Sequence, residues 1–119
     1  MFPYDGYLQL AKDLARKSDE AHLRSSVSRA YYACFHLVKE YAEKRGETFT
    51  ESGLVHDQVR AFLNNSSDLN LQSIGKKQSL LKKDRMICDY NNKLRDVSKL
   101  AVTAIMNAEQ IFSVIKSQK

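Results

Sequence analysis

The sequence predicts an all-α protein, a four- to five-helix up-and-down antiparallel bundle that forms a single domain over residues 1–119. The chain has only 4 Gly and 1 Pro, and because Pro3 lies at its start, no proline interrupts a helix further on. Apolar residues recur every three or four positions along most of the chain, as one face of a helix requires. No segment sustains the apolar–polar alternation of a strand.

The first two helices are expected before residue 46. One runs from about Pro3 to Lys17, since proline is tolerated in a first helical turn. The second follows Ser18, the expected N-cap, and continues to about Arg45, where Gly46 offers a left-handed C-cap. The apolar positions of this second helix lie on one stripe that should face the core: Leu23, Val27, Ala30, Tyr31, Cys34, Val38 and Tyr41.

Three further helices are expected after a loop over residues 46–53. A short one runs from about Leu54 to Leu63, and a longer one covers residues 68–92, with Gly75 as a weak point near its start. Residues 90–96 predict a turn or kink. The apolar positions of the longer helix are Leu80, Leu81, Ile87 and Cys88. The last helix has the cleanest period, and its alanines would let a neighbouring helix approach closely: Val97, Ala101, Ala104, Ala108, Ile111 and Ile115.

Composition narrows the classes of function. No apolar run approaches membrane-spanning length and no signal peptide is visible, so we expect a cytoplasmic protein without a membrane partner. Cys34 and Cys88 fall at apolar positions, which predicts buried thiols in a reducing compartment. The formal net charge of +5 is compatible with an acidic partner such as RNA, although no basic tail demands one.

The second helix carries an unusual face opposite its core stripe. Ser25, Arg29, Tyr32 and His36 follow one another at spacings of four, three and four, and Phe35 lies between the two stripes. An aromatic ring, a guanidinium and an imidazole indicate a partly buried face, as in a central helix or a subunit interface. Either Arg29 pairs with a carboxylate elsewhere, or Arg29 and His36 line a polar groove in which they bind phosphate and transfer a proton.

A second polar cluster lies in residues 82–93. Arg85 and Asp89 are spaced i, i+4, so they either form a local helical ion pair or present Arg85, oriented by Asp89, to a phosphate with Tyr90 nearby. Further positive charge on the same helix belongs to a solvated face or to an RNA-binding one: Lys76, Lys77, Lys82 and Lys83.

Other kinds of chemistry find little support. His36 and Glu40 are spaced i, i+4, but facing Glu-x-x-His repeats that would complete a metal site are missing, so we expect neither a metal nor a cofactor. A glycine-rich phosphate loop and a nucleophile elbow are also missing, which argues against NTP hydrolysis and serine-hydrolase chemistry.

Three blocks together resemble the HEPN domain family, specifically its small stand-alone bacterial and archaeal members. They are SVSRAYYACFHLVKEYAEKRG (26–46), His56, and DRMICDYN (84–91), and the resemblance covers the chain from about Ala11 to Phe112. It implies a helical bundle that pairs as a homodimer. It further implies a metal-independent endoribonuclease of toxin–antitoxin or phage-defence systems, which often acts beside a nucleotidyltransferase partner.

The sequence departs from the family's motif at one point. The late-helix arginine is matched by Arg85, but Asp89 and Tyr90 follow where the family has a histidine. Two hypotheses therefore stay open: an RNA-directed endoribonuclease or RNA binder, and a non-catalytic dimeric adaptor for a nucleotidyltransferase or another protein. For the first hypothesis the candidate catalytic residues are Arg85, Asp89, Arg29 and His36. The candidate RNA-binding or supporting residues are Tyr32, Tyr90, Lys82 and Lys83.

Overall fold

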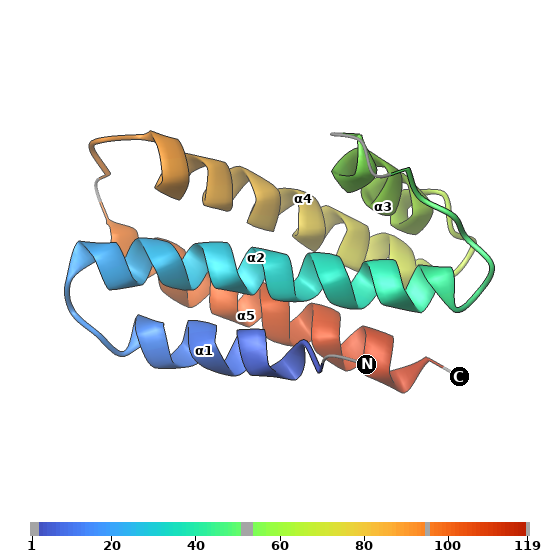
Figure 1. Ribbon diagram of the computed structural model, residues 1–119, viewed down its shortest axis with the longest axis horizontal. Helices are drawn as coiled ribbons and strands as arrows, with labels where there is room; N and C mark the ends of the chain where they lie inside the picture. The colour runs from blue at the N-terminus through green and yellow to red at the C-terminus, as the bar shows by residue number, and fades with distance from the viewer. Residues whose placement is uncertain (1–2, 51–53, 95, 119) are drawn as a thin grey trace.

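The fold was analysed in a computed structural model that describes residues 3–50, 54–94 and 96–118, and all regular structure in these ranges is helical. Its helices are α1 (Asp5–Ala15), α2 (Glu20–Glu43), α3 (Val55–Asn64), α4 (Leu69–Tyr90) and α5 (Val97–Ser117) (Figure 1). The all-α bundle that the sequence predicts is therefore confirmed.

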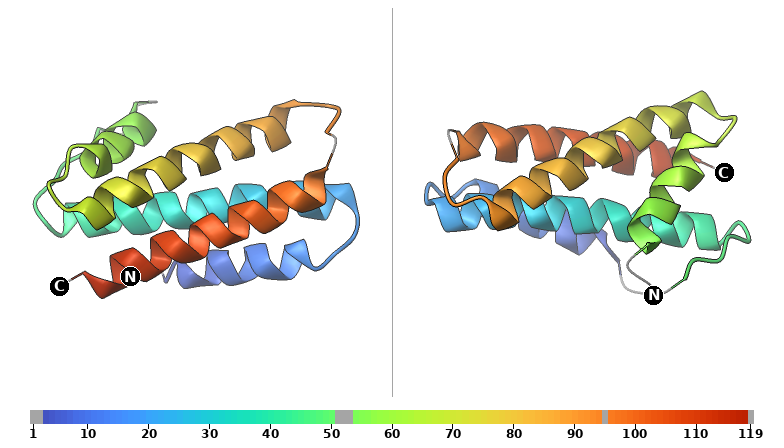
Figure 2. Two further views of the ribbon diagram at one scale, coloured as in Figure 1. Left: turned by 180° about the vertical axis from the view of Figure 1, so that it is seen from behind. Right: turned by 90° about the horizontal axis from the view of Figure 1, so that it is seen from above.

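Helices α1, α2, α4 and α5 lie side by side and alternate in direction along the chain, while α3 crosses one end of the bundle (Figures 1 and 2). Helices α1 and α4 run one way, and α2 and α5 run the other. Helix α2 contacts each of the other four helices, so it is the central element of the fold. This position explains why its face opposite the core is rich in aromatic side chains.

The helix ends follow the expected signals, with one correction. The N-cap of α2 is Asp19 and not Ser18, because Asp19 has the extended backbone of a cap and its carboxylate accepts a hydrogen bond from the backbone N–H of His22 at 3.4 Å. Gly46 adopts the expected left-handed conformation, with φ of 92°. Around it, the N–H of Glu47 bonds to the carbonyl of Ala42 at 3.1 Å, which closes α2 as in a Schellman motif.

Small residues line the contact between α2 and α5 in the core. Cys34 of α2 lies 3.8 Å, measured from Sγ, from the carbonyl oxygen of Ala108 on α5. Such proximity requires short side chains on both helices, and the buried residues there provide them: Ala30, Ala33, Cys34, Ala101, Ala104 and Ala108. The alanine stripe predicted for α5 thus contributes to the surface against which α2 packs. The prediction that Cys34 and Cys88 are buried thiols is also confirmed, since both are free and buried.

Two expectations for α4 are not met. Leu80 was expected at an apolar position of the helix, yet it is 51% exposed. Gly75 is no weak point, because α4 continues through it and it is buried under α3. A Cβ atom there would lie 3.2 Å from Cβ of Leu63 and 2.3 Å from Oδ1 of Asn64, so the glycine lets α3 cross α4 closely.

Arg24 of α2 holds the C-terminal end of α4. Its Nη1 donates to the carbonyl oxygens of Cys88 at 2.7 Å and of Asn91 at 2.5 Å, and its Nη2 donates to that of Asn92 at 3.3 Å. Its Nε also donates to Glu20 at 2.8 Å. A cation is favourable here because the last carbonyls of a helix carry partial negative charge.

Replacement of Arg24 with alanine is therefore expected to lower the free energy of unfolding by about 2 kcal/mol, since hydrogen bonds from a charged donor contribute about 1.5–3 kcal/mol. Urea denaturation followed by circular dichroism measures the change. Arg16→Ala is the matched control: that side chain is 78% exposed, and among the described residues its ion pair is the one with Asp13, at 3.8 Å. Equal stabilities of the two variants would contradict the role of Arg24.

Candidate functional site

Arg85 reaches from α4 onto aromatic rings of α2. Its Cζ lies 5.4 Å from the ring centroids of both Tyr31 and Tyr32, and its Nη1 donates to Oδ2 of Asp89 at 3.2 Å. The side chain is only 14% exposed, and its buried Nε has no hydrogen-bond partner among the described residues. Burial alone would lower the pKa of Arg85, but the hydrogen bond to Asp89 and the nearby tyrosines outweigh it and raise the pKa. The guanidinium is therefore a permanent, fixed positive charge.

His56, in the first turn of α3, lies on the same rings. Its imidazole stacks on Phe35 with centroids 4.1 Å apart, and its Nδ1 shares a hydrogen bond with the hydroxyl of Tyr31. Burial, Lys82 and Arg85 lower the pKa of His56, so the imidazole is neutral at pH 7. Burial raises the pKa of Tyr31, which keeps its hydroxyl protonated. The site thus combines a fixed cation with a neutral imidazole.

His36 and Arg29 lie on the side of α2 that faces α1. The imidazole of His36 stacks on Tyr4 with centroids 4.6 Å apart, and Cζ of Arg29 lies 5.5 Å from the ring centroid of Tyr7. The pKa of His36 is lowered by burial and by Lys39. These contacts come from α1, so the polar face of α2 is covered on both sides.

The rings form one continuous cluster, which we call the aromatic band: Tyr4, Tyr7, Tyr31, Tyr32, Phe35, His36 and His56. Tyr31 and Phe35 are its buried members, and the other rings are half-buried. Arg85 lies at its α4 side, and Arg29 lies at its α1 side. Tyr32 connects the two halves, because it lies under Arg85 and its ring centroid is 6.3 Å from that of His36. Of the predicted residues, Tyr32 and His36 thus belong to the band, Arg85 and Arg29 contact its two opposite sides, and Asp89 reaches it only through Arg85. The two arginines do not meet at one point.

The other predicted residues lie at a neighbouring groove between α3 and α4. Lys82 forms an ion pair with Asp57 at 3.3 Å, and Asp57 also binds Arg60 at 3.1 Å. Tyr90 is 73% exposed and makes no ring contact with Tyr32 within the described parts of the chain. The groove has a volume of about 480 Å³, and its main lining residues are Arg60, Lys82, Lys83, Met86, Ile87 and Tyr90.

Several residues of this region were missed as site candidates. In the sequence analysis His56 was named only as part of the family resemblance, without a role in the site. Tyr4, Tyr7 and Arg60 were not proposed as site residues. The helical period could place each on a face of its own helix, but it does not tell which helix that face meets. His56 reaches the aromatic band because α3 crosses the bundle above α2 and α4 (Figure 2).

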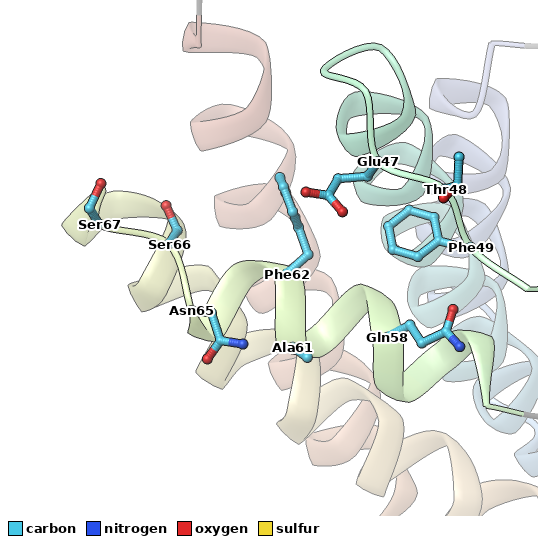
Figure 3. A pocket seen from close by; sticks show the side chains of 9 residues that line it. All are labelled: Glu47, Thr48, Phe49, Gln58, Ala61, Phe62, Asn65, Ser66 and Ser67. Carbon is cyan, nitrogen blue, oxygen red and sulfur yellow. The ribbon is translucent and has the colours of Figure 1, made fainter.

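A separate hollow of about 620 Å³ opens between α3 and the chain that follows α2 (Figure 3). Phe49 and Phe62 stand along it, and Ser66 and Ser67 lie at its far end. Glu47 is the one ionisable side chain among the described residues that line it. None of the described residues that line this hollow is basic, and none of them is a predicted site residue. The hollow is therefore not part of the candidate site.

No group of three or more His, Cys, Asp or Glu side chains lies close enough to ligate a metal ion within the described ranges. None of the helices found in those ranges is both long enough and apolar enough to span a membrane. The chemistry that this arrangement can supply is charge stabilisation by Arg85, proton transfer by His56 and stacking on the half-buried ring of Tyr32.

The two half-buried histidines, His36 and His56, predict a pH dependence of stability. Because the folded protein lowers the pKa values of His36 and His56, the unfolded chain binds more protons below about pH 6.5, and stability should fall as the pH drops through that range. Urea midpoints between pH 8 and pH 5 measure this effect. A double variant with His36→Gln and His56→Gln should show a flatter profile, and identical profiles would contradict the prediction. This comparison also removes the opposing contribution of Asp84, whose pKa burial raises.

Comparisons of the chain with protein families, with curated proteins and with solved structures found no match. A function is therefore inferred from the chemistry of the chain's own residues.

Proposed function

We propose that the protein is an RNA-directed protein of the HEPN type and acts as a metal-independent endoribonuclease at the aromatic band, in a toxin–antitoxin or phage-defence setting. The observation that supports this most is the juxtaposition of Arg85 with the neutral imidazole of His56 across the ring of Tyr31. The late-helix histidine that the sequence lacks next to Arg85 thereby has a substitute from another helix.

The proposed reaction uses the 2′-hydroxyl of the RNA itself. When Nδ1 of His56 donates its hydrogen to the oxygen of Tyr31, Nε2 has a free lone pair and can take the 2′-hydroxyl proton. The 2′ oxygen then bonds to phosphorus while the bond from phosphorus to the 5′ oxygen breaks. The protonated imidazole returns its proton to that 5′ oxygen, so the products are a 2′,3′-cyclic phosphate and a 5′-hydroxyl.

Arg85 contributes charge stabilisation to this reaction. The phosphorane carries more negative charge than the ground-state phosphate, and a fixed guanidinium beside it lowers the barrier without reorganising. Asp89 keeps Arg85 oriented through the 3.2 Å hydrogen bond. The ring of Tyr32 provides a surface on which a base next to the scissile bond can stack.

A specific observation also favours a second function, that of a dimeric adaptor for a nucleotidyltransferase or another protein. Leu80 lines a groove between α4 and α5, and Val102 and Met106 are exposed one turn apart on α5. Exposed apolar side chains on one face mark a candidate protein-binding surface. A homodimer formed there is compatible with both functions, because Leu80, Val102 and Met106 are not part of the aromatic band and make none of the contacts of Arg85 that form the proposed centre.

Incubation of the purified protein with structured RNA in EDTA tests the enzyme. We expect fragments that end in 2′,3′-cyclic phosphate, which mass spectrometry identifies. RNA that stays intact in every buffer would refute the ribonuclease. The adaptor would then remain, and sedimentation of a variant with Val102→Glu and Met106→Glu should show loss of self-association.

A further inference from the structure

The groove between α3 and α4 combines clustered positive charge with an exposed aromatic ring. Arg60 of α3 and Lys82 and Lys83 of α4 supply positive charge, and no residue with an acidic side chain lines the groove within the described ranges. Met86 and Tyr90 stand beside these cations and are 46% and 73% exposed. An exposed aromatic ring next to clustered cations suits a ligand that is both anionic and flat.

The charges of the groove are only partly compensated. Asp57 pairs with Arg60 at 3.1 Å and with Lys82 at 3.3 Å, so one carboxylate serves two cations. Lys83 is exposed and forms no ion pair with a described residue. The groove therefore keeps a net positive charge that an anion can neutralise.

The two ends of the groove differ in character. Lys82 and Tyr90 are eight residues apart on α4, which separates them by about 12 Å along the helix. The carbonyls at the end of α4 near Tyr90 repel an anion, although Arg24 occupies three of them. A phosphate is thus favoured at the end with Lys82, Lys83 and Arg60, and a base is favoured on the ring of Tyr90.

The groove also adjoins the aromatic band. Lys82 forms an ion pair with Asp57 at 3.3 Å, and Asp57 directly follows His56 in the first turn of α3. A strand of RNA that crosses the aromatic band would therefore continue into the groove within a short distance.

We propose that the groove between α3 and α4 binds a nucleotide of single-stranded RNA, with the base on Tyr90 and Met86 and its phosphate on Arg60, Lys82 and Lys83. This inference rests on the proposed function, since it makes the groove the subsite next to the Arg85–His56 centre. Base stacking on an exposed ring is tolerant of sequence, so the groove selects unpaired RNA and not a particular base.

The test is fluorescence anisotropy with a labelled 2′-O-methyl RNA octamer, which binds but has no 2′-hydroxyl to react. Tyr90→Ala is expected to weaken binding about tenfold, the loss of one stacked base, whereas Tyr90→Phe should bind as the wild type does. Lys83→Ala should weaken binding and reduce the slope of log K against log salt by about 1. Lys99→Ala is the charge-matched control, because Lys99 lines the groove between α4 and α5, and it should have no effect.

The outcomes separate this inference from the proposed function. If Tyr90→Ala binds the octamer like the wild type while Arg85→Ala does not, the nucleotide subsite is refuted and the RNA-directed function stands. If the wild type does not bind the octamer, both the nucleotide subsite and the proposed RNA-directed function are refuted. If an abasic oligomer with the same phosphates, or a phosphopeptide, binds as tightly as the RNA, the groove is a general anion site and the assignment of a base to Tyr90 is wrong.

Discussion

Replacement of Arg85 with glutamine is expected to lower the rate of RNA cleavage by about two to three orders of magnitude, the usual cost of removing one group that stabilises transition-state charge. Glutamine retains hydrogen-bonding capacity but removes the cation that lies 5.4 Å from the centroids of Tyr31 and Tyr32. Single-turnover cleavage of an end-labelled RNA in EDTA measures the effect. Arg85→Lys should lose less, because it keeps the charge but not the planar fork that binds phosphate.

Controls separate chemistry from folding. Arg85 is mostly buried, so the circular dichroism spectrum and thermal midpoint of each variant must accompany its rate. Arg16→Gln removes the same charge from an exposed position in the α1–α2 connection and should cleave normally. A folded Arg85→Gln protein that cuts RNA at the wild-type rate would refute the role of Arg85.

A paired comparison of the two histidines extends this result. His56→Gln should reduce cleavage by about two to four orders of magnitude, as expected for loss of a general base, whereas His36→Gln should have a smaller effect. His36 is stacked on Tyr4 at the α1 side of the aromatic band, away from the hydrogen bond between Tyr31 and His56. A larger loss for His36→Gln would contradict the role of His56 and would instead assign proton transfer to His36, as the sequence analysis suggested.

Ala108→Leu is expected to destabilise the protein by about 3 kcal/mol, at the upper end of the usual cost of overpacking a core. Ala108 is completely buried, and its carbonyl oxygen lies 3.8 Å from Sγ of Cys34. A leucine there must push α2 and α5 apart, which would loosen the core on both sides of the contact. For a domain of this size the loss is a large part of the total stability, about 5–15 kcal/mol.

Urea denaturation measures this change, and the chain provides a matched control. Ala21→Leu makes the same substitution at an exposed position in the first turn of α2, where alanine and leucine have similar helix propensities. It should change the free energy of unfolding by less than about 0.5 kcal/mol. Similar losses in the two variants would mean that the close packing of α2 on α5 contributes little.

The helices could be predicted closely from the sequence. Helix α5 was placed from the spacing of its apolar residues alone, and the structure has it at Val97–Ser117 with Ala101, Ala104 and Ala108 buried. The ends of α2 followed from short-range signals, with an error of one residue at the cap. These features are local: a repeat of 3.6 residues and a capping side chain act within a few positions of the chain.

The candidate site could be predicted only in part. The i, i+4 pair of Arg85 and Asp89 is local, and the structure contains it. The tyrosines under Arg85 and the imidazole beside them come from α2 and α3, and nothing in the spacing within α4 indicates these neighbours. The exposure of Leu80 could not be predicted for the same reason. It depends on how much of α4 is covered by α5, and the spacing of apolar residues within α4 does not indicate that.

The sequence alone determined that this chain is a set of amphipathic helices, where they begin and end to within about two residues, and, apart from Leu80 of α4, which positions are apolar and buried. Only the tertiary structure decided that α3 carries His56 onto the rings of α2, that Arg85 covers the same rings from α4, and that tyrosines of α1 extend the surface on the far side. The reason is physical: a helix forms through interactions within a few residues, whereas a site between helices depends on which surfaces pack together, and that is settled by the free energy of the whole core.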